Sequence, residues 1–273
     1  MNRAFIFLIL YFAFPAHSVK AQNTFTFPTH LPKELCLDSM LTRSYQMTTD
    51  MYNYNIQGDF LGKTRLTGRL TYGGQPTNAQ WSEVYVSTAG GENTAFPQGK
   101  QLAYLQGFSY RQNESLLSPD FFQSRLPEAD PYVMNLFWDA LGFEALAYAC
   151  WDSLTLNREF LATDINKALT IANIGSFENK DTRITWTGVT EMNQELCAII
   201  RYTVMNNPLH VTWEEMSMRG RSHYWGEIYV SLSDKQIEYA CLTEDVLTDV
   251  RIKGQENSQI GYVVRSIHFV KTE

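Results

Sequence analysis

The C-terminal part of the chain carries the pattern that most restricts the possible fold. From Thr182 onward, apolar and polar residues alternate in six stretches: RITWTGV, ELCAIIRYTV, LHVTWEEMSM, SHYWGEIYVSL, QIEYACLTEDV and IGYVVRSIHFV. A period of two places successive side chains on opposite faces of a β-strand. Short connections such as MNNP and SLSDKQ separate the stretches, which is typical of antiparallel neighbours. The sequence therefore predicts an antiparallel meander of six strands.

Helical spacing appears in two other parts of the chain. Between residues 32 and 53, apolar residues recur at helical spacing, and Pro32 suits a first helical turn. Residues 131–149 are apolar on nearly all sides apart from a narrow stripe around Asn135 and Asp139. Such a segment predicts a helix that is buried on most sides.

These elements predict the fold class α+β, with a curved antiparallel β-sheet, an N-terminal helix and a long buried central helix. Residues 58–87 alternate and add strands to the sheet, and a short helix is expected near Thr163–Ala172. We expect residues 22–273 to form a single domain. A subdivision near 118–181 is the alternative, because strand-like segments lie on both sides of that region.

The first 21 residues have the pattern of a secretory signal peptide. One positive charge at Arg3 precedes an apolar run, and small residues follow up to Ala21. No later segment is apolar enough for a membrane helix, so we expect a periplasmic or secreted protein without a transmembrane segment. Removal of residues 1–21 takes away Arg3 and Lys20 and changes the formal net charge from −7 to −9. An acidic surface argues against nucleic acid as a partner.

The four cysteines are Cys36, Cys150, Cys197 and Cys241. An oxidising compartment permits disulfides, and Cys197 with Cys241 is the favoured pair because both lie in strand-like stretches. Buried free thiols are equally compatible with their apolar neighbours. No Cys/His spacing resembles a zinc site, so neither a metal nor a cofactor is expected.

The stretch GRSHYWGEIYVSLSDKQIEYA concentrates polar and aromatic side chains in one predicted hairpin. Alternation places His223, Trp225 and Glu227 on one face and the core residues on the other. A functional interpretation makes His223 and Glu227 an acid/base pair, with Arg219 or Arg221 holding an anionic group. The favoured interpretation is a solvated framework face whose charges pair across strands.

Two carboxylates on the predicted central helix, Asp139 and Glu144, lie among Phe and Trp residues, an environment that can raise a carboxyl pKa. The favoured interpretation is that one of them bonds a backbone group. They are five residues apart and do not share a helix face. The chain contains no GxSxG, HExxH, GxxxxGK[ST] or GxGxxG motif. No catalytic residue is therefore assigned.

The stretches WGEIYVSLSDKQIEYACLTEDV and GDFLGKTRLTGRLTY resemble strands of the periplasmic lipoprotein-carrier (LolA-like) superfamily. The resemblance covers about a third of the chain that remains after residue 21, and it lies in the pattern rather than in a diagnostic motif. It implies an incurved antiparallel sheet with helices on its concave side and an apolar cavity for acyl chains or a partner peptide.

The leading hypothesis is a non-enzymatic binding protein for an apolar small molecule or lipid, or for a cell-envelope protein. The candidate ligand-binding residues are Phe137, Trp138, Trp213, Trp225, His223 and Glu227. One alternative is a hydrolase of envelope polymers that uses Glu215 and Glu227 on neighbouring strands. A purely structural surface protein is the other. A carboxylate pair about 5–10 Å apart in a cleft favours the hydrolase.

Overall fold

The computed structural model describes residues 29–38, 40–73, 78–112, 116, 118–126, 131–171, 175–213 and 215–272. The strands are β1 (Arg43–Asn55), β2 (Phe60–Tyr72), β3 (Asn78–Ala89), β4 (Lys100–Gln101), β5 (Phe108–Arg111), β6 (Glu159–Leu161), β7 (Ala168–Ile171), β8 (Gly175–Glu178), β9 (Arg183–Met192), β10 (Glu195–Trp213), β11 (Met216–Ser231), β12 (Ile237–Ile252) and β13 (Gln259–Lys271). The α-helices are α1 (Pro119–Arg125) and α2 (Pro131–Tyr148), and short 3-10 helices span Ala103–Leu105 and Trp151–Ser153. The predicted signal peptide lies outside the described residues.

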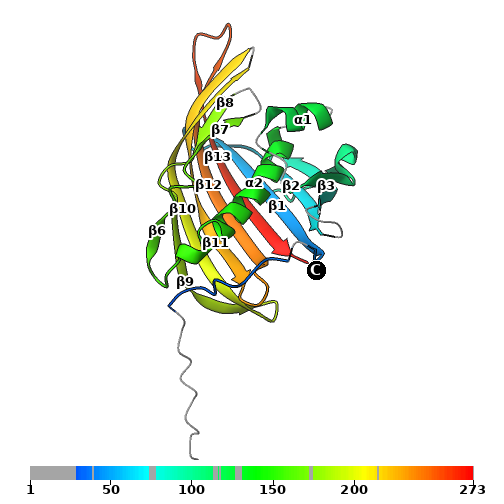
Figure 1. Cartoon of the computed structure of the whole chain (residues 1–273). Coiled ribbons are helices and arrows are strands. Elements are labelled where there is room, and N and C mark those ends of the chain that lie inside the picture. Colours follow the sequence, from blue (N-terminus) through cyan, green and yellow to red (C-terminus); the bar gives the residue numbers. More distant parts are fainter. Residues whose placement is uncertain are drawn as a thin grey trace, which may run out of the picture.

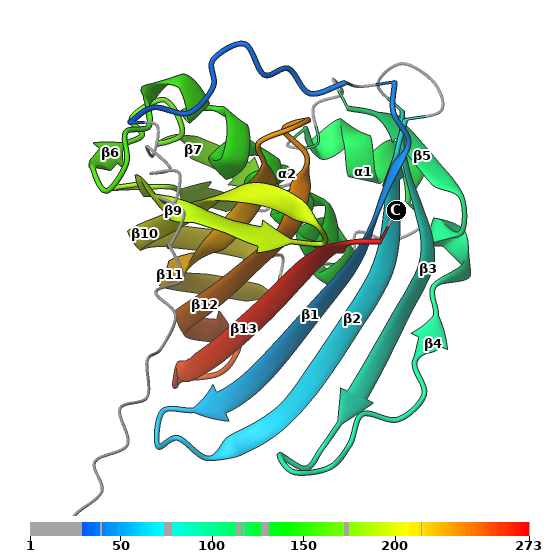
Figure 2. The ribbon, with the colours of Figure 1, turned by 90° about the horizontal axis from the view of Figure 1, so that it is seen from below.

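One large antiparallel sheet dominates the molecule. Its main path runs β4-β3-β2-β1-β13-β12-β11-β10-β8-β7, while β5 pairs with β3, β9 pairs with β10, and β6 pairs with β9. The last strand, β13, lies between β1 and β12. The first and the last strand of the chain are therefore neighbours in the middle of the sheet. Figure 2 shows the sheet curving around α2.

The predicted α+β class with an N-terminal helix is wrong. The described residues of the segment expected to form that helix contain turns and irregular backbone and then β1, which pairs with β2 and β13 along its length. Tyr45, Met47 and Met51 are buried at alternate positions of this strand. Their odd-numbered spacing fits a period of two as well as a helix, and pairing on both sides of β1 decides in favour of the strand.

Two smaller expectations in the C-terminal half are also corrected. The short helix near Thr163–Ala172 is absent, and β7 occupies its second half. The MNNP sequence is not a turn, because β10 continues through it as one strand of 19 residues. The register with β11 shifts between Val204 and Asn207, and Asn206 has a φ of 63°. The extra residues therefore form a bulge instead of a chain reversal.

The helix α2 lies on the concave face of the sheet and runs obliquely to the strands (Figure 1). Its fully buried Phe137 contacts rings from the sheet and from α1, including Trp81 at 5.4 Å and Phe122 at 5.8 Å between centroids. These aromatic side chains fill the space between α2 and the strands. The helix has 18 residues, a length of about 27 Å. The 16 residues of β12 extend for about 53 Å, so α2 covers only part of each long strand.

Candidate functional site

A buried ionic layer, formed by Asp139, Glu244 and Arg265, joins α2 to the sheet. The Arg265 guanidinium donates to Glu244 on β12 and to Asp139 on α2, and all three side chains are at most 12% exposed. Ser222 completes the layer by donating to Glu244 Oε1 at 2.5 Å. Burial would lower the pKa of Arg265, but the charges of Asp139 and Glu244 outweigh it and raise that pKa.

Asp139 titrates far from its usual range. Burial is the main cause and raises the pKa of Asp139 to about 6, although the charge of Arg265 acts in the opposite direction. Arg265 is shared with Glu244, whose own charge also raises the Asp139 pKa. Burial likewise raises the pKa of Glu144, which lies 3.7 Å from Arg43 of β1. Both carboxyl pKa values are raised, which is the less favoured of the two interpretations, and each carboxylate faces an arginine of the sheet.

Beyond the ionic layer, the concave face carries half-buried apolar side chains that lie outside the core, together with buried polar residues such as Ser222 and Thr248. We define the distal strip as the half-buried inner-face residues Leu209, Met218, Val246, Val250 and Val263. Met218 pairs with Val250, and Val246 pairs with Val263, across neighbouring strands. None of the five belongs to the hydrophobic core that the described residues form. Figure 1 shows this end of β10–β13 extending past α2 at the top of the view.

A row of small residues crosses the distal strip. Gly220, Thr248 and Gly261 are cross-strand neighbours on β11, β12 and β13. A Cβ atom at Gly220 would lie 2.2 Å from the Leu247 carbonyl oxygen, so this position requires glycine. The row lies between the two pairs of larger apolar side chains. Side chains along this row are therefore shorter than those on either side of it from β11 to β13, and Leu209 ends the row at β10.

The predicted ligand-binding residues are divided between the two faces of the sheet. Phe137 and Trp138 lie on α2 against the concave face, where Trp138 Nε1 donates to the Leu116 carbonyl at 2.9 Å. His223, Trp225 and Glu227 lie on the outer face, at the alternate positions that the sequence predicts.

Trp225 is 38% exposed. Trp213 ends β10, and its side chain lies outside the described part of the structure. These residues therefore do not form one pocket.

Glu227 is held in an ion pair and does not face Glu215. Its Oε1 accepts from Arg201 at 2.8 Å and its Oε2 accepts from Tyr229 at 3.0 Å. The hydrogen bond from Arg201 is the main reason why the Glu227 pKa is lowered. Glu215 precedes β11 by one residue, so Glu227 lies about 40 Å away along the same strand. The carboxylate pair of the hydrolase hypothesis is not brought together.

The predicted disulfide is also absent, because Cys197 and Cys241 are both free thiols. Cys197 pairs with Ser231 and Cys241 pairs with Glu227, so β11 separates them and their positions differ by four residues along it. That separation exceeds the Cα distance of about 7 Å that a disulfide tolerates.

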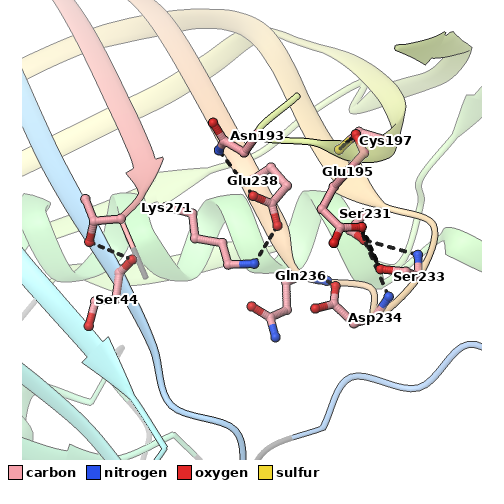
Figure 3. Close-up of polar contacts among 11 residues, drawn as sticks. Ser44, Asn193, Glu195, Cys197, Ser231, Ser233, Asp234, Gln236, Glu238 and Lys271 are labelled. Atoms are coloured by element: carbon pink, nitrogen blue, oxygen red, sulfur yellow. Dashed lines mark hydrogen bonds and ion pairs between the residues drawn. The ribbon is translucent and has the colours of Figure 1, made fainter. Parts of the chain in front are cut away.

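A polar cluster at the opposite end of the strands from the distal strip is shown in Figure 3. Glu238 is 2% exposed and accepts from Lys271 Nζ at 2.6 Å and from Asn193 at 3.2 Å. Ser231 and Ser233 both donate to Glu195. Burial, followed by the charges of Glu238 and Glu195, raises the pKa of the nearby Cys197 thiol to about 12.

A thiol with so high a pKa is a poor nucleophile. Both serines of the cluster donate to the same oxygen, Glu195 Oε2, and Ser231 Oγ also accepts from the Ser233 backbone N–H. We therefore assign it a structural role in closing the β11–β12 turn.

Among the residues that the structure describes, no group of three or more His, Cys, Asp or Glu side chains is arranged to hold a metal ion. Among the same residues, no helix has the length and hydropathy that a membrane crossing requires.

No protein-family model and no curated protein matches the chain. Three solved structures are partly similar. Lipovitellin, from a study of its lipid–protein interactions, has 11% identity and a TM-score of 0.39, and the match covers 86% of this chain and 26% of that chain. A DUF1329 family protein from Desulfovibrio piger has 10% identity and a TM-score of 0.13, with 83% and 84% covered.

The third is botulinum neurotoxin type C, described as interacting with two ganglioside molecules. It has 9% identity and a TM-score of 0.11, with 84% of this chain and 82% of that chain covered. This chain thus spans about a quarter of the lipovitellin chain it matches. Because every TM-score is below 0.5, no function follows from these similarities. No family model supports the expected resemblance to the lipoprotein-carrier superfamily.

Proposed function

We propose that this chain is a non-enzymatic binding protein that holds an apolar ligand, such as a lipid acyl chain, against the distal strip. The observation that carries the proposal is the division of the concave face into a filled core and an apolar surface outside that core. Contact with a ligand would remove these apolar side chains from water, at about 25 cal/mol per Å².

The shape of the strip favours an extended ligand over a compact one. The row of Gly220, Thr248 and Gly261 runs across the strands between larger apolar residues. An acyl chain lying along this row would contact Val246 and Val263 on one side and Met218 and Val250 on the other. The buried ionic layer limits how far such a chain reaches toward α2.

We also propose that the protein is exported, on the basis of the signal-peptide pattern in residues 1–21. Expression of the complete chain from its own start codon in a bacterium tests both proposals together. Export predicts a periplasmic product whose denatured mass lacks residues 1–21. Ligand binding predicts a larger native mass and a lipid in the organic extract. The two measurements fail independently, because one concerns the polypeptide and the other its ligand.

Binding at the distal strip is tested with a fluorescent fatty acid and the variant Val250→Asp. A carboxylate on the inner face would be desolvated by the ligand, so we expect affinity to fall about tenfold or more. The matched control is Leu247→Asp, the same change on the outer face of the same strand, where Leu247 is 43% exposed.

The control should bind as tightly as the unmodified protein, and thermal unfolding should show that both variants are folded. Equal losses in the two variants, or no binding by the unmodified protein, would contradict the proposal.

A further inference from the structure

The outer face of the same strand ends carries a polar groove of about 300 Å³. This volume is at the lower limit for small-molecule sites. The groove is lined by His210, Thr212, Ser217, Arg219, Asp249 and Arg251. It lies on the side of the sheet opposite to the distal strip, because these residues alternate with those of the strip along β10, β11 and β12.

The strand register arranges the six residues as two rows across three strands. His210 pairs with Arg219, which pairs with Asp249. In the neighbouring row, Thr212 pairs with Ser217, which pairs with Arg251. Neighbouring strands are about 4.8 Å apart, and the rows are about 7 Å apart. One ligand the size of a sugar ring can therefore reach both arginines.

The polar groups of the groove are incompletely paired. The Arg219 guanidinium makes no hydrogen bond or ion pair with any described residue. Arg251 is 72% exposed, and its Nη2 lies 3.6 Å from Asp249 Oδ2, beyond hydrogen-bonding distance. The other oxygen, Asp249 Oδ1, is buried and has no hydrogen-bond partner. The groove thus offers two guanidinium donors and one partly exposed carboxylate, Asp249.

We propose that this groove binds a hydroxylated organic anion, of which a sugar acid is the simplest example. The acid group would accept hydrogen bonds from Arg219 and Arg251, since guanidinium groups match the geometry of a carboxylate. A ligand hydroxyl would donate to Asp249 Oδ2, since the Asp249 side chain is 39% exposed while Oδ1 is buried. Ser217, which lies beside Arg251 and two residues before Arg219 on β11, supplies a further hydroxyl. Two arginines on three neighbouring strands make the local charge of this groove more positive than the formal net charge of −7 suggests for the chain as a whole.

This proposal does not depend on the proposed apolar ligand, because the two sites occupy opposite faces of the sheet. It also separates Arg219 from Arg221, which the sequence presents as equivalent candidates for holding an anionic group. Both arginines are exposed on the outer face of β11, but only Arg219 lines the groove. Arg221→Ala is therefore a matched control for Arg219→Ala.

Calorimetric titration at low salt tests the proposal with three probes: glucuronate, glucose and cyclohexanecarboxylate. Glucose lacks the acid group, and cyclohexanecarboxylate lacks the hydroxyls. We expect saturable binding of glucuronate only, or at least tenfold tighter binding of glucuronate than of either other probe. Arg219→Ala and Arg251→Ala should each weaken glucuronate binding about tenfold, because each removes charge-assisted hydrogen bonds. Arg221→Ala should leave it unchanged.

Asp249→Asn tests the hydroxyl contact separately. This variant should reduce the preference for glucuronate over cyclohexanecarboxylate severalfold while retaining the binding of the acid group. Three outcomes would each overturn the proposal. They are the absence of saturable glucuronate binding, an equal loss in Arg221→Ala and Arg219→Ala, and equal affinities for glucuronate and cyclohexanecarboxylate in the unmodified protein.

Discussion

The same long strands have two different environments along their length. In the proximal half, between the buried ionic layer and the β11–β12 turn, inner-face residues such as Ile228, Val230 and Ala240 are fully buried under α2. In the distal half, beyond the layer, inner-face residues such as Val246 and Val250 are half-buried and lie outside the core. Both halves have the same strand partners and the same alternation of side chains.

The difference shows that the alternation places apolar residues on one face but does not determine how much of that face becomes core. The extent of the core follows from the length of α2, about 27 Å against about 53 Å for β12. The ionic layer lies where the two environments meet. Arg265 bonds both carboxylates through Nη1 and Nη2, while its buried Nε has no hydrogen-bond partner in the described part of the chain.

Among the predicted changes, loss of Arg265 from the buried ionic layer should lower the free energy of unfolding most. Arg265→Leu leaves Asp139 and Glu244 buried without their shared cation, and we expect the free energy of unfolding to fall by about 4–5 kcal/mol. Urea denaturation measures this change.

Arg251→Leu is the control, because it removes an arginine that is 72% exposed on the neighbouring strand. The control should lose less than about 0.5 kcal/mol. If the two variants lose similar free energies of unfolding, the buried ionic layer contributes no more to stability than an exposed arginine does.

The second prediction concerns pH and uses Asp139→Asn. The pKa of Asp139 is about 6 in the folded protein, above its ordinary value of 3.8. Between these values the unfolded chain has lost the proton and the folded chain keeps it. The stabilisation is therefore complete below about pH 3.8 and is lost as pH rises through about 6.

Relative to Asp139→Asn, the unmodified protein should lose on the order of 2–3 kcal/mol between pH 4 and pH 7. Denaturation of both proteins across this range measures the difference. A difference that is constant with pH would show that Asp139 titrates normally.

The local parts of this architecture can be predicted from the sequence. Alternation correctly assigns His223, Trp225 and Glu227 to the outer face, and the apolar run at 131–149 corresponds to α2. The prediction of an N-terminal helix fails because the positions of Tyr45, Met47 and Met51 fit both a helix and a strand. Pairing with β13, more than 200 residues later in the chain, selects the strand.

The two candidate sites depend on contacts that no local pattern contains. Asp139 and Arg265 are separated by 126 residues in the sequence, so their pairing follows from where α2 crosses the sheet. The groove depends on the registers of three strands, which place Arg219 beside Asp249 and Ser217 beside Arg251. The signal for it in the sequence is limited to polar residues at every second position of each strand.

The smallest predicted effect comes from an ion pair on the outer face of the proximal half, opposite the core. Glu227→Gln removes the pair with Arg201, whose side chain is 60% exposed. We expect a loss below about 1 kcal/mol at neutral pH, since solvent screens exposed pairs. The hydrogen bond from Arg201 lowers the pKa of Glu227, so its contribution is present above the ordinary pKa of about 4.5 and is lost as pH falls.

This pH dependence has the opposite sign to that of Asp139, although both carboxylates bind an arginine of the same sheet. Burial decides the sign for Asp139, whereas the hydrogen bond decides it for Glu227. Denaturation of Glu227→Gln between pH 3 and pH 7 should therefore show a difference from the unmodified protein that grows as pH rises. A stability difference that shrinks as pH rises would mean that burial raises the Glu227 pKa, as it does for Asp139. The two faces of the sheet would then not differ in the sign of their pH dependence.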